Sequence, residues 1–307
     1  MKQKSYIAYA SVILAMIFWS FTFVWYKVVY QYYNPITTVL FRLVISSVFL
    51  LLLTYPLKRL QKLKVKDFKY FALVTFYQPF LYFIGESYGV QLVSSTLSSV
   101  IIATIPLFTV IVSFFFYKEK ISKTNILGII FSVIGVSLVI FNKSENLTAS
   151  TLGISMLLLA VFASIGYSIV IKKLSNKYNS ITIVTYHNIL GVFYFIPLFF
   201  IFDYKDFLLS GFSDDAWVPL LELAIFGSSF AFIFFTFSIK KLGVTKANAF
   251  TNMIPVFTAI FAFYVLDETL NTSKITGISF VIAGLFLSQI KTLSLKDKLK
   301  IFIKPNE

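Results

Sequence analysis

Four ionisable side chains lie inside long apolar stretches of this 307-residue sequence, where a charged group is costly to bury. They are Arg42, Glu86, Glu222 and His187, and His187 is the single histidine of the chain. Ionisable residues within membrane segments often mark pathways for substrates, ions or protons. For all four, a structural role in pairing or packing and a functional role both stay open.

Glu86 is the candidate for proton coupling, because a carboxyl group within the membrane can take up and release a proton. Arg42, or Lys27 near the end of the first apolar stretch, could instead anchor a substrate carboxylate. A helix rise of about 1.5 Å per residue places these three residues and Glu222 in the same half of the membrane. The alternative is therefore that two positive and two negative charges neutralise one another.

The composition indicates an integral membrane protein. Hydrophobic residues make up 58% of the chain and charged residues 13%, whereas a soluble domain is about half apolar and one quarter charged. The absence of cysteine excludes disulfides, thiolate metal sites and cysteine nucleophiles. The net charge of +14 comes from short runs between apolar stretches, as topology signals do, so we expect no nucleic-acid partner. We also expect no cofactor, no metal and, without a G-x-x-x-x-G-K-[ST] motif, no ATP-driven transport by this chain alone.

One long unit occurs twice in the sequence. The stretches 94–138 and 243–287 share landmarks that are 149 residues apart, including Ile-Pro-x-Phe-Thr at 105–109 and 254–258. A fixed offset over this length indicates a duplicated unit. The other matching landmarks are Glu119 with Glu268, Gly128 with Gly277, and Gly135 with Gly284.

Each copy predicts a long apolar helix with a proline near its middle, a polar turn with a glutamate, and a second apolar helix. Pro106 and Pro255 are predicted helix kinks, and Pro79 is a third. Paired kinks in two halves favour a binding site at the repeat interface, although inherited packing kinks are the alternative. We interpret Glu119 and Glu268 as structural groups near helix N-termini and the paired glycines as close helix contacts.

Ten apolar stretches have about the length that a bilayer requires. They are 6–29, 35–55, 69–89, 93–117, 124–141, 152–171, 181–202, 217–239, 245–266 and 273–290. With the N-terminus in the cytoplasm, 22 of the 27 Lys and Arg residues lie on the cytoplasmic side, including those of a basic tail at 291–307. We therefore expect a multi-pass protein with both termini cytoplasmic.

Five stretches fall in each copy, and an odd number turns the second copy upside down in the membrane. The sequence thus predicts two inverted repeats, at 6–141 and 152–290, which is a common plan for alternating access. The first parts of the copies align more weakly, at an offset of 145 residues, which pairs Arg42 with His187.

Polar and aromatic residues at several positions would suit a cavity with aromatic walls and a few hydrogen-bonding groups. Many aromatic side chains must nevertheless face lipid or the membrane interfaces, because Phe, Tyr and Trp make up 19% of the chain. The candidate cavity residues are Trp19, Thr22, Gln78, Tyr82, Glu86, Ser99, Tyr167, Asn248 and Asn252.

The arrangement resembles the drug/metabolite transporter (DMT) superfamily, specifically its ten-helix EamA-type members. Trp19-Ser20-Phe21 is similar to the family's W-G opening, with Ser20 in place of glycine. The most recognisable part of the family domain resembles the I-P-L-F…E…G…G pattern at 105–135 and its second copy at 254–284. The resemblance covers about residues 6–290. It implies an all-α integral membrane fold of ten transmembrane helices in two inverted five-helix repeats. It also implies a central cavity and transport of amino acids, metabolites or drugs, often outward.

We therefore expect a secondary transporter, not an enzyme, that exports a small amphipathic metabolite such as an amino acid or a drug-like compound across the plasma membrane. One alternative is an intramembrane hydrolase in which Ser168 and His187 form a nucleophile and base. Another is a lipid-handling or scaffold protein in the bilayer. The substrate, the direction, coupling to protons or another ion, and formation of a homodimer are left open.

Overall fold

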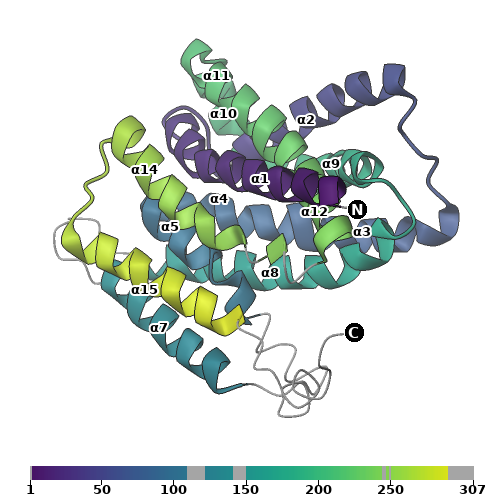
Figure 1. Ribbon diagram of the computed structural model, residues 1–307. Coiled ribbons are helices and arrows are strands. Elements are labelled where there is room, and N and C mark those ends of the chain that lie inside the picture. The colour runs from purple at the N-terminus through teal and green to yellow at the C-terminus, as the bar shows by residue number, and fades with distance from the viewer. Residues whose placement is uncertain (1, 109–121, 141–149, 244–246, 249, 290–307) are drawn as a thin grey trace, which may run out of the picture.

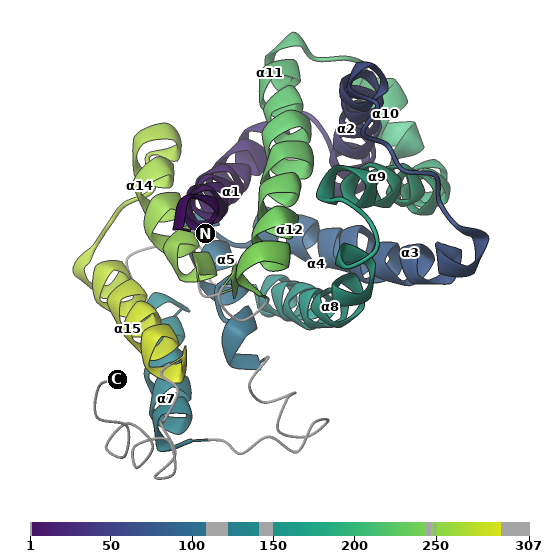
Figure 2. The same cartoon turned by 45° about the vertical axis from the view of Figure 1, so that its right-hand side comes forward.

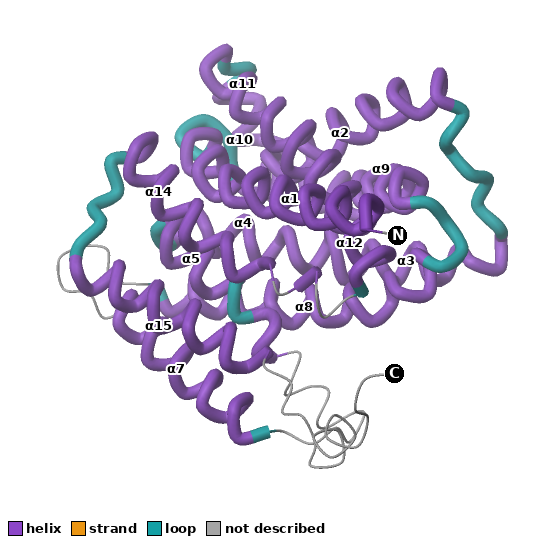
Figure 3. Tube along the Cα trace, viewed as in Figure 1, coloured by secondary structure: helices purple, strands orange, loops and turns teal. Residues whose placement is uncertain are grey.

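The computed structural model describes residues 2–108, 122–140, 150–243, 247–248 and 250–289. These residues form helices joined by short connections, with no strand among them (Figures 1 and 3). The elements of the first half are α1 (Lys2–Val29), α2 (Pro35–Leu57), η1 (Val65–Asp67), α3 (Phe68–Thr75), η2 (Phe76–Leu81), α4 (Tyr82–Leu92), α5 (Ser95–Ile102) and α7 (Lys123–Ile140). Those of the second half are α8 (Thr151–Ser175), α9 (Ser180–Leu198), η3 (Phe199–Asp203), α10 (Tyr204–Ser210), α11 (Asp214–Glu222), η4 (Leu223–Phe230), α12 (Ala231–Leu242), η5 (Phe250–Met253), α14 (Ile254–Leu266) and α15 (Thr272–Gln289).

Several helices begin where the sequence supplies an N-cap. The Ser150 hydroxyl accepts a hydrogen bond from the backbone N–H of Gly153 at the start of α8. The Asn179 side chain accepts one from Thr182 at 2.7 Å at the start of α9. Pro35 occupies the first turn of α2, where its missing N–H costs nothing.

Six helical stretches among the described residues are long and apolar enough to cross a membrane. They are Tyr6–Val29, Pro35–Pro56, Lys123–Ile140, Thr151–Ser175, Ser180–Ser210 and Asp214–Leu242, and three shorter apolar helices accompany them. The predicted segment at 93–117 runs into residues outside the described part of the chain. The architecture is therefore all-α with several membrane-spanning helices, and the number ten stays a prediction.

The predicted segment at 69–89 is bent rather than straight. Gln78 has extended backbone angles (φ −149°, ψ 120°) inside the wide turn η2, next to Pro79. Gly166 of α8 allows this bend to pack closely, since a Cβ atom there would lie 2.5 Å from the ring of Tyr77. A second wide turn, η4, occupies the matching place in the second half, 149 residues further on.

Pro106 and Pro255 do not kink the middle of continuous helices, which corrects the expectation from the sequence. Helix α5 ends at Ile102, two turn residues follow, and helical structure resumes before Pro106. Pro255 lies in the first turn of α14, directly after the 3₁₀ turn η5. Proline fits the first turn of a helix because no N–H is needed there, so both prolines start a new helix after a break.

Equivalent helices of the two halves make exchanged contacts. α4 packs on α8, and its equivalent α12 packs on α1; likewise α2 contacts η4, and α9 contacts η2. α7 and α15 form a close pair at one edge of the molecule (Figures 1 and 2). Each half thus completes its packing with elements of the other half.

The α7–α15 pair is antiparallel and symmetric in register. Added Cβ atoms at Gly135 and Gly277 would lie 2.5 and 2.7 Å from each other's carbonyl oxygens, and Gly284 approaches the carbonyl of Gly128 in the same way. Because Gly128 is equivalent to Gly277 and Gly135 to Gly284, exchanging the halves maps this contact onto itself. Such a self-complementary contact is what a twofold axis perpendicular to the two helices produces.

Candidate functional site

A cavity lies between the two halves. Its walls come from α1, α2, η2, α4 and α5 of the first half and from α8, α12, η5 and α14 of the second. Aromatic and aliphatic side chains dominate these walls, with a few polar groups among them. This composition is typical of small-molecule sites.

The cavity is built from equivalent positions of the two repeats. Four pairs 149 residues apart contribute from both halves, and three pairs 145 residues apart do so from α1 and α8. The first set is Phe83 with Phe232, Glu86 with Phe235, Ile102 with Thr251, and Ile105 with Ile254; the second is Trp19 with Ser164, Thr22 with Tyr167, and Phe23 with Ser168. The cavity therefore follows the internal symmetry of the chain.

Most of the residues expected to line a cavity do so. Those that line it are Trp19, Thr22, Gln78, Tyr82, Glu86, Tyr167 and Asn248. Ser99 lies outside it: the side chain is fully buried, and the hydroxyl donates to the carbonyl of Thr96 one turn earlier at 2.7 Å. Asn252 also lies outside it and lines a separate groove between α14 and α15.

Several lining residues were not singled out from the sequence, chiefly the phenylalanines. Phe83 and Phe232 line the cavity, and Phe235 stands at the position equivalent to Glu86. Their residue type gave no signal, since phenylalanine occurs 37 times in the chain. The repeat offset could have found some of them, because it carries Trp19 to Ser164 and Glu86 to Phe235.

The charged centre of the cavity is the pair formed by Arg42 and Glu86. The Arg42 Nη1 atom lies 3.9 Å from Glu86 Oε2, and the two side chains are only 2% and 6% exposed. Tyr82 donates its hydroxyl hydrogen to Glu86 Oε1 at 2.8 Å, and Tyr26 donates to Oε2 at 3.3 Å. Arg42 Nη1 also donates to the Tyr26 hydroxyl oxygen, which places Tyr26 between the two charges.

Arg42 is held in place by both halves of the molecule. Its Nε atom donates to the Ser228 hydroxyl of η4 at 2.7 Å. Its guanidinium carbon lies 4.3 Å from the ring centroid of Phe83 and 5.1 Å from that of Tyr26, within the range of cation–π attraction. A buried guanidinium fixed in this way can serve either structural pairing or recognition of a negative group.

The other two membrane charges do not join this pair. Lys27 Nζ donates to the backbone carbonyl of Gln91 at 3.3 Å. Glu222 lies half-buried at the end of α11 and makes no ion pair with the residues that the structure describes. The expected neutralisation of four charges is therefore limited to Arg42 and Glu86.

His187 is buried beside the cavity, at the position equivalent to Arg42. Its ring centroid lies 5.4 Å from that of Phe232 and 5.9 Å from that of Tyr167. No hydrogen bond joins either of its ring nitrogens to Ser168 in the described part of the chain. The Ser–His pair that a hydrolase would require is therefore not formed. Among the described residues, no three His, Asp or Glu side chains gather as metal ligands would.

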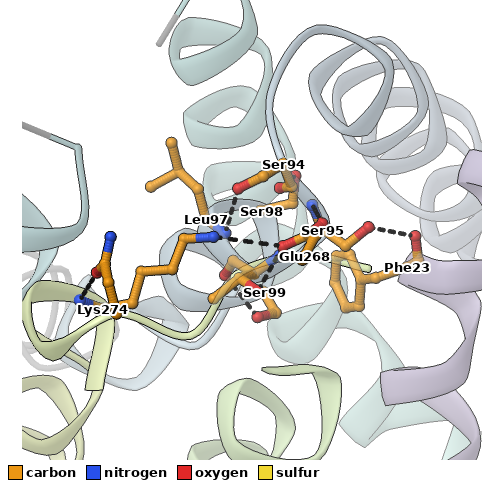
Figure 4. Close-up of polar contacts among 10 residues, drawn as sticks. Phe23, Ser94, Ser95, Leu97, Ser98, Ser99, Glu268 and Lys274 are labelled. Atoms are coloured by element: carbon orange, nitrogen blue, oxygen red, sulfur yellow. Dashed lines mark hydrogen bonds and ion pairs between the residues drawn. The ribbon is translucent and has the colours of Figure 1, made fainter. Parts of the chain in front are cut away.

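One carboxylate of the second repeat caps a helix of the first (Figure 4). Glu268 accepts hydrogen bonds from the backbone N–H of Ser95 at 2.8 Å and from the Thr96 hydroxyl at 2.7 Å, at the N-terminus of α5. Lys274 Nζ lies 3.8 Å from the same carboxylate. The Ser95 hydroxyl in turn donates to the carbonyl of Phe23, which lines the cavity. Glu119, its counterpart, lies outside the described residues.

Comparisons with known proteins agree with this architecture. A model of the EamA-like transporter family matches residues 6–141 and again residues 151–289. The chain belongs to the EamA-like transporter family. It is thus a multi-pass membrane transporter, as the resemblance to the DMT superfamily predicted.

Relatives of this EamA-like chain are found in bacteria and archaea. The uncharacterized transporter YetK of Bacillus subtilis is 30% identical over 81% of this chain and 77% of its own length. An uncharacterized transporter of Archaeoglobus fulgidus is 29% identical over 89% of this chain and 95% of its own. A solved crystal structure shares the fold with a TM-score of 0.67 at 12% identity and covers 98% of this chain and 99% of that chain.

Proposed function

We propose that this protein is a secondary transporter that exports a small amphipathic metabolite, such as an amino acid or a drug-like compound, by alternating access. The observation that carries the proposal is the cavity lined by equivalent positions of both repeats. In a protein of inverted repeats, exchange of the two halves' conformations opens one central site first to one side of the membrane and then to the other.

The antiparallel α7–α15 contact supports an inverted arrangement. If α7 and α15 both cross the membrane, their antiparallel packing means that the two repeats enter it from opposite sides. The symmetric contact at the paired glycines would then correspond to a twofold axis in the plane of the membrane. The domains at 6–141 and 152–290 are the two units that this axis would relate.

The amphipathic character of the substrate follows from the cavity walls. Phe23, Phe83 and Phe232 offer apolar surface, whereas Gln78 and Asn248 offer amide groups that can donate and accept hydrogen bonds. A molecule with an apolar body and few polar groups fits this combination better than a strongly hydrated one.

Glu86 is the proposed coupling group. It lies at the cavity wall, and the groups that face it are Arg42 of α2, Tyr26 of α1 and Tyr82 of its own helix α4. Uptake of a proton by the carboxylate would weaken its attraction to Arg42 and free the guanidinium for a negative substrate group. In proteoliposomes, the variant Glu86→Gln should transport without the pH dependence of the wild type, whereas an unchanged pH dependence would remove Glu86 from coupling.

The orientation rests on the distribution of lysine and arginine. Both termini lie in the cytoplasm and the protein resides in the plasma membrane under this proposal, since 22 of the 27 basic residues then face the cytoplasm. Export places the released substrate in the medium, where it can be measured.

Metabolite profiling of the medium tests the proposal. Cells that express the wild type should accumulate at least one small molecule outside that cells without the gene do not. Replacing Ser164 by tryptophan (Ser164→Trp) fills the cavity from α8 and should abolish this difference. Ser155→Trp, on an exposed face of the same helix, is the matched control and should export as the wild type does. An identical profile for wild-type cells and cells without the gene would contradict export.

A further inference from the structure

A second hollow, which we call the α14–α15 groove, opens on the side of the molecule. Its lining comes from η5, α14 and α15. Phe250, Met253, Phe257 and Ile282 give it apolar walls. None of these groove residues lines the central cavity, to which η5 contributes Thr251 instead.

Asn252 is a polar residue among the apolar residues that line this groove. The side chain is 3% exposed, and neither its oxygen nor its nitrogen has a hydrogen-bond partner among the described residues. A buried polar group without a partner is unfavourable, and native proteins rarely keep one. A ligand for this groove would therefore combine an apolar part with a group that bonds to an amide.

Two residues that line the groove are exposed on apolar helices. Val256 is 37% exposed and Phe286 63% exposed, and both lie on apolar helices. Helix α15 ends at Gln289, and the sequence continues with five lysines between 291 and 304, which marks the nearby membrane surface. A groove beside the end of α15 would thus open close to the boundary between lipid chains and head groups.

The first repeat does not carry the same feature. The position equivalent to Asn252 is Ala103, and the position equivalent to Ile282 is Val133, which is 60% exposed on α7. The amide is therefore not required by the fold that both repeats share. The face of α7 around Val133 offers an internal comparison, because it is an exposed apolar helix face too.

We propose that the α14–α15 groove binds one acyl chain of a membrane phospholipid and that the Asn252 amide donates a hydrogen bond to an ester carbonyl of that lipid. The acyl chain fills the apolar walls, and the ester group lies at the level where the groove opens. The amide oxygen can accept a hydrogen bond from water that hydrates the glycerol region. This site is separate from the transport cavity, so the test of lipid binding does not depend on whether the protein exports a substrate.

Photolabelling tests the site in the full-length protein. The protein is reconstituted in vesicles of phosphatidylethanolamine and phosphatidylglycerol that contain a phosphatidylglycerol with a diazirine on one acyl chain, and peptides are mapped after illumination. We expect adducts on segments 250–257 and 282–286 at several times the frequency found on 126–134 of α7. Equal labelling of the two faces would overturn the proposal.

Two variants separate the amide from the groove itself. Asn252→Ala installs the residue that the first repeat has at this position and should lower groove labelling about fivefold, as the loss of one hydrogen bond worth roughly 1 kcal/mol predicts. Ile282→Trp fills the groove and should abolish the labelling there, whereas Val133→Trp, its counterpart on α7, should leave groove labelling unchanged. Wild-type labelling in Asn252→Ala would overturn the role of the amide. A cross-link from the groove to residues 290–307 of the chain itself, instead of to lipid, would overturn the choice of lipid as occupant.

Discussion

The Arg42–Glu86 pair buries two charges within the apolar part of the molecule. Both side chains are nearly inaccessible to water, and each charge depends on the other and on Tyr26 and Tyr82 for compensation. Removing one partner of a buried pair leaves an uncompensated charge, which is more destabilising than losing the pair itself.

We predict that Arg42→Met lowers the free energy of unfolding by about 3 kcal/mol. Adding Glu86→Gln to this variant should recover a large part of the loss, because no buried charge then remains. Thermal unfolding of the purified protein in detergent measures both effects. Lys27→Met is the matched control, since Lys27, near the end of α1, hydrogen-bonds the backbone carbonyl of Gln91 and forms no ion pair with Glu86, and its effect should be small. If Arg42→Met unfolded at the same temperature as the wild type, the pair would not contribute to the stability of the protein.

At the residue scale, the sequence was informative where a residue type is rare and weak where it is common. Arg42, Glu86 and His187 stood out because charges and histidine are unusual in apolar stretches, and all three lie at or beside the cavity. The phenylalanine walls could not be chosen from so many phenylalanines. Ser99 was wrongly expected in the cavity, because its hydroxyl hydrogen-bonds a backbone carbonyl of its own helix, and the sequence does not reveal such a bond.

Among the secondary-structure elements, the connections are held by specific polar contacts. The carboxylate of Asp67, at the end of η1, accepts hydrogen bonds from Lys177 Nζ at 2.6 Å and from the Tyr178 hydroxyl at 3.0 Å. These bonds link the α2–α3 connection to the end of α8. The hydrogen bond from Lys177, followed by that from Tyr178, holds the pKa of Asp67 below its ordinary 3.8. The hydrogen bond to Asp67 likewise raises the pKa of Lys177 above 10.5.

This contact predicts how stability changes with pH. A carboxyl group whose pKa is lowered on folding stabilises the protein above its unfolded pKa and loses that contribution as the pH falls through the folded value. The contribution of Asp67 should be complete at neutral pH, begin to fall near the ordinary pKa of 3.8 and be lost as the pH drops through the lower folded pKa. Asp67→Asn should therefore have a lower melting temperature than the wild type at pH 7, with the difference shrinking in acid. Asp214→Asn, at an exposed position, is the control. A difference that stayed constant down to acid pH would contradict the contact.

The Glu268 cap is a contact between repeats that must be released if α5 moves away from the α14–α15 connection (Figure 4). We predict that Glu268→Ala makes the cavity more accessible from the side of that connection. Because the chain has no cysteine, Thr22→Cys introduces a single thiol into the cavity, and its reaction with a membrane-impermeant maleimide reports access. The reaction rate should rise severalfold in Glu268→Ala. Asp267→Asn, at the neighbouring residue, should leave it unchanged, and equal rates for all three would contradict the role of the cap.

Element positions followed from the apolar stretches, whereas their internal breaks did not. Hydrophobic length identified segments that the structure also forms as helices, such as 6–29 and 152–171. The breaks at Gln78 and before Pro255 depend on what packs beside them, for example Gly166 against Tyr77. Proline marked the vicinity of each break but not its kind, because proline serves equally in a kink and in a first turn.

At the scale of the whole molecule, the internal repeat explains both the fold and the cavity. Glycines let the backbones of α7 and α15 approach each other closely, and these glycines occupy equivalent positions in the two repeats. The repeat was visible in the sequence through Pro106 with Pro255 and the paired glycines. The exchanged packing, with α4 on α8 and α12 on α1, was not visible, because a single sequence contains no contacts.

The glycine contact gives a prediction for the whole fold. Gly135→Val would place side-chain atoms against the backbone of Gly277 and should lower the free energy of unfolding by about 1–3 kcal/mol. Thermal unfolding measures it, and Ser279→Val on an exposed face of α15 is the control, with a change near zero. A wild-type melting temperature for Gly135→Val would contradict the close antiparallel packing.

The central claim is that one cavity between the repeats is reached in turn from both sides of the membrane. The most direct measurement is the labelling of Thr22→Cys by a membrane-impermeant maleimide, first on intact cells and then on inside-out vesicles. We predict labelling in both preparations, and loss of both when Ser164→Trp fills the cavity. Labelling from one side alone, or from neither, would contradict alternating access.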